Sequence, residues 1–231
     1  MRRAADLPRV TPTGGCGRLQ AGAAADACVG PGQRPPQGTE GDDRAGRRAV
    51  PAARPVSQDF TADAPNRLWF GDITYVRTWD GWAYVASVID AFSRKVVGWA
   101  VADHMRTDLV LDALRMAITR RHPPKGVIFH ADRGSQYTSK EFVDFCKINN
   151  VRNSVGRTGI CFDNAAAESF WATLKKEFIH LHPFDTVERL RTGVFEYIEV
   201  YYNRLRIHST IGYLTPVEFE DEFDKKGDRA A

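Results

Sequence analysis

The sequence predicts an α/β fold in which a mixed sheet is flanked by helices. Short apolar runs typical of strands fill residues 68–103, segments with helical periodicity follow, and further short apolar runs separate those segments. Three strands followed by helices that alternate with short strands indicate a mixed sheet. At 231 residues the chain could hold one domain of ordinary size, or one domain and a tail.

The first predicted elements are three strands and a helix. The strands are LWFGDITYV (68–76), WAYVASVIDAF (82–92) and RKVVGWAVAD (94–103), because each is rich in β-branched or aromatic residues. The helix is TDLVLDALRMAITRR (107–121), whose apolar residues recur near the helical period. Its expected N-cap is Thr107.

Strands and helices alternate in the next stretch. VIFHA (127–131) is apolar at successive positions, as expected for a strand buried on both faces. The helix KEFVDFCKINN (140–150) follows Ser139, which is a good N-cap residue. VRNSV (151–155) is a further short strand.

Two helices are predicted toward the end of the chain. A glycine-bearing loop, GRTGICFDN (156–164), precedes the helix AAAESFWATLKKEFIH (165–180), with Asn164 as the expected cap. A further helix, TVERLRTGVFEYIEVYYNR (186–204), is rich in apolar and aromatic residues.

The chain divides by composition into three regions. Residues 1–55 are dominated by Ala, Gly, Pro and Arg, and no aromatic residue precedes Phe60. Such a segment buries too little apolar surface to offset its ordering entropy, so we predict a disordered low-complexity segment. A folded core is expected over 56–219 and a charged tail over 220–231.

Composition excludes several classes of protein. Hydrophobic residues make up 43% and charged residues 26%, and no apolar run reaches the roughly 18 residues of a membrane helix. The start, MRRAADLPRV, lacks the apolar centre of a signal peptide, so a cytoplasmic location is expected. The four cysteines form no CxxC pair, which argues against structural zinc and a disulfide framework.

The net charge of +3 is weak, so any nucleic-acid contact must come from local basic patches. Such clusters occur at TRRHPPK (119–125), LKKE (174–177) and NRLRIH (203–208). Each cluster on its own is better explained as a solvated face.

Two aspartates stand out because they follow or interrupt apolar strands. Asp132 comes at the end of VIFHA, and the carboxyl ends of strands are where ligands bind in open α/β sheets. Capping of the next helix is the alternative, although Ser139 lies closer to that helix. Asp72 shares a strand face with Phe70, Thr74 and Val76. Burial of its ionised carboxylate would therefore cost roughly several kcal/mol of free energy, unless a cation or hydrogen-bond donors compensate.

Glu168 is a third candidate, in the first turn of the helix that begins at residue 165. Acids are common in first turns, so taken alone it has an ordinary explanation. Lys175 lies seven residues later on the same helix face, where it could hold a substrate phosphate or could simply be solvated.

Taken together, the three acids predict a metal site. Asp72, Asp132 and Glu168 could form an all-oxygen site that suits Mg²⁺ or Mn²⁺. Two such ions can activate an attacking oxygen and stabilise a leaving one during phosphoryl transfer. We leave Asp90, at the end of VASVID, outside this set as a structural residue.

The motifs around these acids resemble those of a known family. GDITYV with Asp72, HADRGSQYTS with Asp132 and DNAAAESFWATLKKE with Glu168 are similar to the catalytic motifs of insertion-sequence transposases with a retroviral-integrase-type core. Thirty-five residues separate Asp132 from Glu168, as is typical of that family, and the closing YYNRLRIHSTIGYLTPVEFE is similar to its C-terminal signature. The resemblance implies a ribonuclease H-like fold, a metal site of the DDE type and cut-and-join chemistry on transposon ends.

The resemblance also implies partners. Double-stranded DNA of the element ends and of the target would be bound by a homo-oligomer, with Lys175, Arg204 and Arg206 contacting phosphates. Residues 1–50 match none of the helical DNA-binding segments usual in the family, so a separate helix-turn-helix subunit or fusion partner is expected. The alternatives are a hydrolytic ribonuclease H-like nuclease and a non-catalytic, DNA-binding remnant of a transposase.

Overall fold

The computed structural model describes residues 62–156 and 165–230 of the chain. The predicted disordered segment at residues 1–55, most of the predicted loop before residue 165, and Asn164 as a cap lie outside the described residues. In the part of the chain that is described, no helix is long and apolar enough to cross a membrane.

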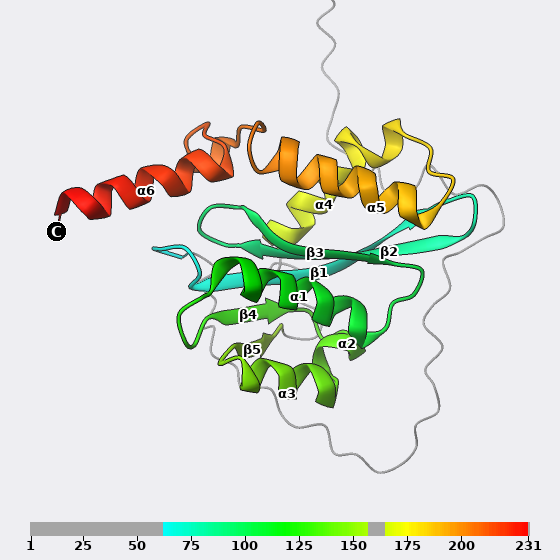
Figure 1. The fold of residues 1–231 in the computed structure, drawn as a ribbon, viewed down its shortest axis with the longest axis horizontal. Helices are drawn as coiled ribbons and strands as arrows, with labels where there is room; N and C mark the ends of the chain where they lie inside the picture. Colours follow the sequence, from blue (N-terminus) through cyan, green and yellow to red (C-terminus); the bar gives the residue numbers. More distant parts are fainter. Residues whose placement is uncertain (1–61, 157–164, 231) are drawn as a thin grey trace, which may run out of the picture. The chain divides into compact units, whose positions relative to one another are not determined.

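A mixed five-stranded sheet in the order β3-β2-β1-β4-β5 forms the centre of the described structure (Figure 1). Strand β2 (Trp82–Asp90) pairs antiparallel with both of its neighbours, β1 (Leu68–Arg77) and β3 (Val96–Ala102). Strands β4 (Ile128–Ala131) and β5 (Arg152–Val155) run parallel to β1. The predicted α/β class is therefore confirmed.

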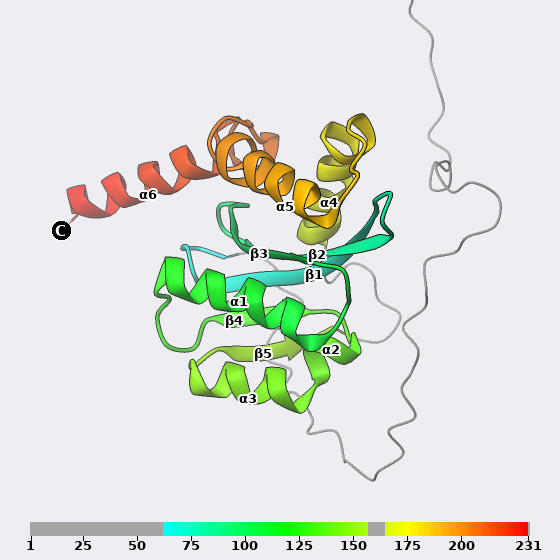
Figure 2. The same cartoon turned by 45° about the vertical axis from the view of Figure 1, so that its right-hand side comes forward.

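Helices cover both faces of this sheet (Figures 1 and 2). Helices α1 (Thr107–Arg121) and α3 (Lys140–Ile148) lie on one face, together with the short α2 (Ser135–Thr138). Helices α4 (Ala165–Glu177) and α5 (Val187–Phe195) lie on the other. This arrangement encloses the sheet between two apolar layers.

The C-terminal region contains shorter turns and one helix that the sequence did not indicate. A 3₁₀ turn, η2 (Ile179–Leu181), follows α4. The π-helix η3 (Glu196–Tyr202) continues α5 directly, so the predicted helix over 186–204 is present but changes from α-helical to π-helical at residue 196. A second 3₁₀ turn, η4 (Ser209–Ile211), then leads to α6 (Pro216–Ala230).

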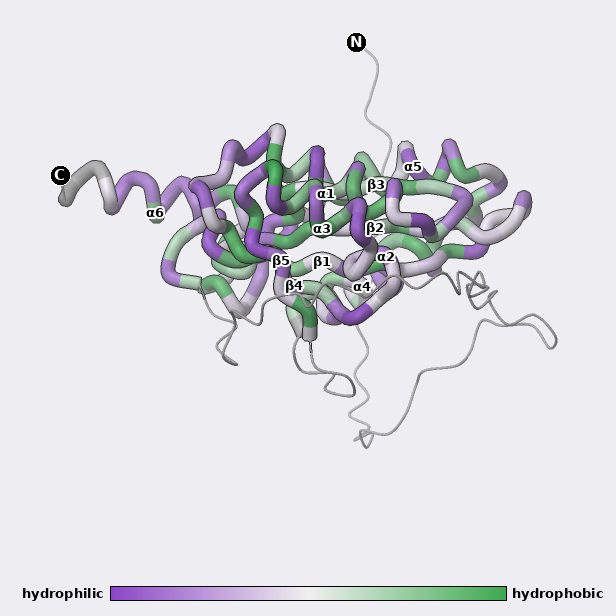
Figure 3. Tube along the Cα trace, turned by 90° about the horizontal axis from the view of Figure 1, so that it is seen from below, coloured by the Kyte–Doolittle hydropathy of each residue, from purple (hydrophilic) through white to green (hydrophobic). Residues whose placement is uncertain are grey.

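Alternate residues of β1 enter two separate cores, as the period of a strand requires. Phe70 and Val76 pack with α4 and α5, whereas Trp69 packs with α1 and with Phe129 of β4. In Figure 3 hydrophobic segments gather along the central strands, whereas α6 is mostly hydrophilic. The expectation that Asp72 shares its strand face with core residues is thus correct.

The two predicted caps had different outcomes. Ser139 caps α3, and its hydroxyl accepts a hydrogen bond from the backbone N–H of Phe142 at 3.1 Å. The prediction for Thr107 is wrong, because Thr107 is the first helical residue and Arg106 occupies the cap position without a side-chain hydrogen bond. In place of a cap hydroxyl, the carboxylate of Asp108 accepts from the N–H of Leu109 at 2.9 Å.

Helix α6 is attached to the sheet through a buried acid. Glu220 is 6% exposed and accepts hydrogen bonds from Lys95 and Ser93, both at 2.7 Å. Both of its oxygens also accept from the Arg121 guanidinium at 2.9 Å. The expected boundary between core and tail, at residue 220, therefore falls inside α6.

Gly71, next to Asp72, is required by close packing against β4. A methyl group at this position would lie 2.1 Å from Cζ of Phe129. Phe129 cannot easily move, because its ring also packs against Tyr137 and Phe142 at centroid distances of 5.8 and 5.4 Å. The absence of a side chain at Gly71 thus lets β1 and β4 approach.

We predict that Gly71→Ala lowers the free energy of unfolding by about 1–3 kcal/mol, because the added methyl overpacks a core that cannot relax. Denaturant unfolding of the full chain measures this. Gly227→Ala is the matched control, since nothing lies within 4 Å of its added methyl and α6 should become slightly more stable. Equal stability of wild type and Gly71→Ala would contradict the packing argument.

Candidate active site

Asp72 lies in the middle of β1 and is partly buried against α4. One of its oxygens accepts a hydrogen bond from the N–H of Ile73 at 2.8 Å. The other accepts from the indole Nε1–H of Trp171, on α4, at 3.1 Å. These two donors fix the direction of the carboxylate, so the side chain is held in place before any ligand binds.

Asp132 follows the neighbouring parallel strand β4, at the position that corresponds to Asp72 in β1. The last residue pair between β1 and β4 is Phe70 with His130, and each aspartate comes two residues later. Asp132 is exposed, and its Oδ1 accepts a hydrogen bond from the N–H of Gly134 at 3.0 Å. The carboxylate therefore stabilises the tight turn out of β4, while Ser139 caps the longer helix that follows.

Glu168 projects from the first turn of α4 and is exposed to solvent. The same helix carries Trp171, which contacts Asp72, so α4 brings Glu168 toward the strand ends. The small residue Ala167 is fully buried, which agrees with a close approach of this turn to the sheet.

Asp132 and Glu168 lie near enough to Asp72 to affect its ionisation. Burial, together with the negative charges of Asp132 and Glu168, raises the pKa of Asp72 from 3.8 to about 6, against the hydrogen bonds from Ile73 and Trp171. In the described ranges, no three His, Cys, Asp or Glu side chains are close enough together to form a metal-ion site as they stand. The structure therefore shows two acids close enough to act on the ionisation of Asp72 and leaves metal binding as a proposal.

Lys175 is half-buried on α4 and lies near Asp72. Burial lowers the pKa of Lys175, and the negative charge of Asp72 partly offsets that change. Its Nζ lies 5.3 Å from the centroid of the Tyr75 ring. The expectation of a positive charge in the surroundings of Asp72 is met by this residue.

Models of the integrase core domain match residues 62–161 and 168–223. The IS904 transposase of Lactococcus lactis is 42% identical over 176 residues, which cover 75% of this chain and 70% of that protein. This chain belongs to the family of insertion-sequence transposases with an integrase-type core.

The InsF transposases of IS3 elements in Escherichia coli K12 are 48% identical over 167 residues, or 72% of this chain. The match covers 58% of the length of InsF, so this transposase chain spans somewhat more than half of those relatives.

Solved structures show the same fold as the transposase core. The HTLV-2 integrase catalytic core in complex with magnesium matches with a TM-score of 0.52 and 17% identity, over 68% of this chain and 98% of that one. An integrase chain of the simian T-cell lymphotropic virus intasome, solved with a PP2A regulatory subunit, matches with a TM-score of 0.58 and 20% identity, over 69% and 56%. These likenesses confirm the predicted ribonuclease H-like fold.

The C-terminal basic residues differ in their surroundings. Arg204 is exposed. Arg206 instead forms a two-pronged ion pair with Glu177 at the end of α4, with N–O distances of 2.8 and 2.9 Å. That hydrogen bonding lowers the pKa of Glu177. A contact of either arginine with DNA stays a prediction, and Arg206 would have to make it while bonded to Glu177.

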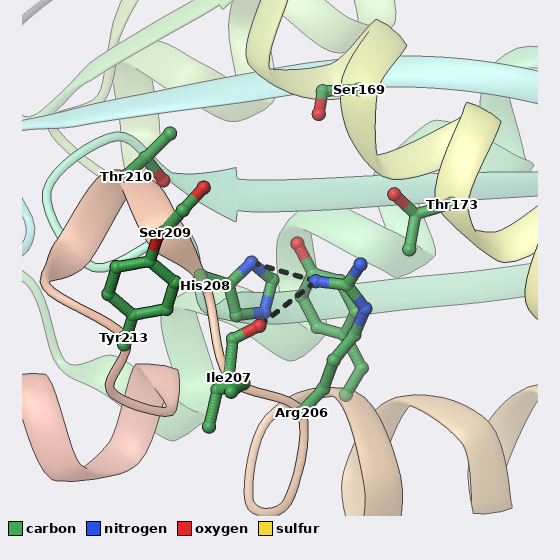
Figure 4. Close-up of a pocket in the computed structure, with 9 residues that line it drawn as sticks. Ser169, Thr173, Arg206, Ile207, His208, Ser209, Thr210 and Tyr213 are labelled. Carbon is green, nitrogen blue, oxygen red and sulfur yellow. Dashed lines mark hydrogen bonds between the residues drawn. The ribbon is translucent and has the colours of Figure 1, made fainter. Parts of the chain in front are cut away.

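Arg206 also lines a pocket of about 320 Å³ between α4 and the C-terminal turns (Figure 4). Its guanidinium donates to Nδ1 of His208 at 3.3 Å, so that nitrogen must carry the lone pair. Burial and the Arg206 charge lower the pKa of His208 to about 4, which agrees with a neutral ring. The lining is Ser169, Thr173, Tyr202, Arg206, Ile207, His208, Ser209, Thr210 and Tyr213.

Tyr137 is a residue near the acids that the sequence analysis did not select. It is fully enclosed, and its pKa is raised well above 10, first by burial and then by the charges of Asp72 and Asp132. The tyrosine lies inside the HADRGSQYTS motif, but nothing in its spacing marks it as a neighbour of Asp72.

Asp90 is buried and accepts hydrogen bonds from the backbone N–H groups of Asn66 and Phe92. These bonds agree with its interpretation as a structural residue.

We predict that Asp72→Asn stabilises the folded chain by about 1–3 kcal/mol at pH 7. The folded-state pKa lies above the unfolded value, so the favourable contribution of Asp72 is present below about pH 4 and is lost as the pH rises through about 6. The stability difference between variant and wild type should accordingly vanish at pH 4.

Denaturant unfolding in a chelator, at both pH values, measures this difference. Asp144→Asn is the control, because Asp144 is exposed and its pKa is lowered by a hydrogen bond from Lys140. It should give no gain in stability at pH 7. A stability gain for Asp72→Asn that is the same at both pH values would show that the ionisation of Asp72 is not its cause.

Proposed function

We propose that this chain is the catalytic domain of a transposase that nicks DNA at the ends of its element and joins the freed 3′-hydroxyl to target DNA. The observation that carries the proposal is the placement of Asp72 and Asp132 at equivalent positions, two residues beyond the last pair between the parallel strands β1 and β4, with Glu168 close enough to shift the pKa of Asp72. Membership in the transposase family supports the reaction class.

The acids suit a divalent cation. Three carboxylates offer the oxygen donors that Mg²⁺ and Mn²⁺ prefer, and the raised pKa of Asp72 marks a place where added positive charge is favourable. Asp72, Asp132 and Glu168 would hold the ions. When bound, such ions activate the attacking oxygen and stabilise the leaving oxygen of an in-line phosphoryl transfer.

The other residues of the site position the acids and the substrate. The Trp171 indole and the Ile73 N–H keep Asp72 directed. The Gly134 N–H does the same for Asp132. Lys175 places a positive charge close to Asp72, where its ammonium would bind a phosphate oxygen next to the scissile bond.

The partners follow from this reaction. The substrates would be the double-stranded element ends and target DNA, bound by a homo-oligomer in the cytoplasm. Likeness to an intasome and to integrase cores solved as dimers and trimers supports an oligomer. A separate helix-turn-helix subunit or fusion partner would supply recognition of the ends.

We predict that Asp132→Asn abolishes nicking and joining in Mg²⁺ and leaves DNA affinity nearly unchanged, because it removes a metal-binding charge but little contact area. The assay follows labelled DNA that carries the element ends, and it separates nicked from joined products. Asp144→Asn is the control and should retain activity, because Asp144 lies on α3 with its side chain 42% exposed.

The same assay separates the alternatives. Nicking without joined product would indicate a hydrolytic nuclease. Binding without metal-dependent nicking in the wild type would indicate a non-catalytic remnant. Full activity of Asp132→Asn would contradict the metal mechanism itself.

A further prediction concerns the basic residues. Lys175→Gln and Arg204→Gln should each weaken DNA binding across sequences and reduce the slope of log K against log salt by roughly 1, because each removes one phosphate contact. Titrations at several salt concentrations measure the slope. Arg206→Gln should also lower stability, since it leaves Glu177 without its ion-pair partner. An unchanged slope would mean that the residue faces solvent in the complex.

A further inference from the structure

Two aromatic rings with a cation at each end form a row along β1 and β2 that leads away from the acids. Nζ of Lys175 lies 5.3 Å from the ring centroid of Tyr75. That ring meets Trp82 edge to face, at a centroid distance of 5.3 Å and an angle of 82°. Cζ of Arg77 lies 5.3 Å from the centroid of the Trp82 ring. We call Lys175, Tyr75, Trp82 and Arg77 the aromatic row.

Strand pairing explains why these side chains meet. Tyr75 and Arg77 are two residues apart on β1 and so share a face, and Arg77 pairs directly with Trp82 on β2. Tyr75 is therefore the diagonal neighbour of Trp82, within reach of a large ring. In the described part of the chain, β1 pairs with β4 only as far as Phe70, so the edge of β1 beside Tyr75 is not covered by β4.

The aromatic row starts at the candidate active site. Lys175 lies one helical turn after Trp171 on α4, and the Trp171 indole donates to Asp72 at 3.1 Å. Tyr75 points to the opposite face of β1 from Asp72 but is 45% exposed, so its ring is accessible to a ligand. Lys175 thus lies between the acids and the ring, and a strand that leaves a phosphate at the acids would reach Tyr75 past Lys175 and the uncovered edge of β1.

A cation beside an aromatic ring suits one ligand class particularly well. A nucleotide can stack its base on the ring and place its phosphate at the cation, so both protein groups keep a favourable partner. The base must be unpaired, because in an intact duplex the faces of the bases are covered by their neighbours.

We propose that the aromatic row binds an unpaired nucleotide segment of the DNA next to the phosphate at which the acids act. This inference rests on the proposed function and adds a substrate feature to it, namely single-stranded DNA at the reacting end. The rings supply sequence-tolerant stacking, and the two cations hold the phosphates on either side.

The test is DNA binding by the full chain in a chelator, so that no reaction takes place. Two fluorescent probes are compared: a blunt duplex and the same duplex with a short single-stranded overhang. Wild type should prefer the overhang. Tyr75→Leu should bind the overhang duplex roughly tenfold more weakly and the blunt duplex unchanged, because only stacking is lost.

Two variants serve as matched controls. Tyr75→Phe keeps the ring and should behave like wild type, since stacking does not need the hydroxyl. Trp79→Leu removes a ring that is 77% exposed at the tip of the same hairpin, outside the aromatic row, and should change affinity by less than about twofold.

Equal affinity of wild type for both probes would overturn the inference, and so would an equal loss on both probes in Tyr75→Leu. A loss in Trp79→Leu as large as that in Tyr75→Leu would likewise overturn the assignment to this row. Failure of the proposed function is separate, because nicking in Mg²⁺ is scored independently. If the chain nicks DNA but does not prefer the overhang, the proposed function stands and the inference about the aromatic row fails. If the chain prefers the overhang but does not nick, the inference stands and the proposed function fails.

Discussion

The parallel pairing of β1 with β4 is the constraint on which the rest of the site depends. This pairing extends over three residue pairs and ends at Phe70 with His130, so the strands β1 and β4 separate just before Asp72 and Asp132. Because the pairing is parallel, the two acids occupy equivalent positions, two residues beyond the last pair of this ladder. The tight contact of Gly71 with Phe129 maintains this register. The same separation uncovers the edge of β1 farther along, where Tyr75 is exposed.

The electrostatics of the site work against stability and in favour of ligand binding. Asp72 is partly buried among core residues, and at neutral pH it keeps its charge next to two other acids. Its two hydrogen-bond donors only partly offset that cost, which explains why its pKa stays raised. Perturbed groups of this kind are concentrated at functional sites, where a bound cation or substrate supplies the missing compensation.

Helix α4 connects the acids to the C-terminal region. At its start it carries Glu168 and, one turn later, Trp171, whose indole reaches Asp72. At its end, Glu177 is held by both prongs of Arg206. The C-terminal signature therefore anchors the helix that carries the third acid, and this gives the basic segment a structural role that is independent of DNA contact.

The sequence by itself determined the features that depend on local pattern. The period of apolar residues gave the strands and most helices, Ser139 was recognisable as a cap, and the position of Asp72 in an apolar strand marked it as a site that needs compensation. Tertiary structure alone decided the features that depend on distant partners. The cap of α1 lies at Arg106, one residue before the predicted Thr107. The ion pair of Arg206 with Glu177 joins residues that are 29 positions apart in the sequence. Tyr75 gained its cationic neighbour only when α4 packed on the sheet, since contacts between distant segments are set by the packing of whole elements and leave no periodic signal in the chain.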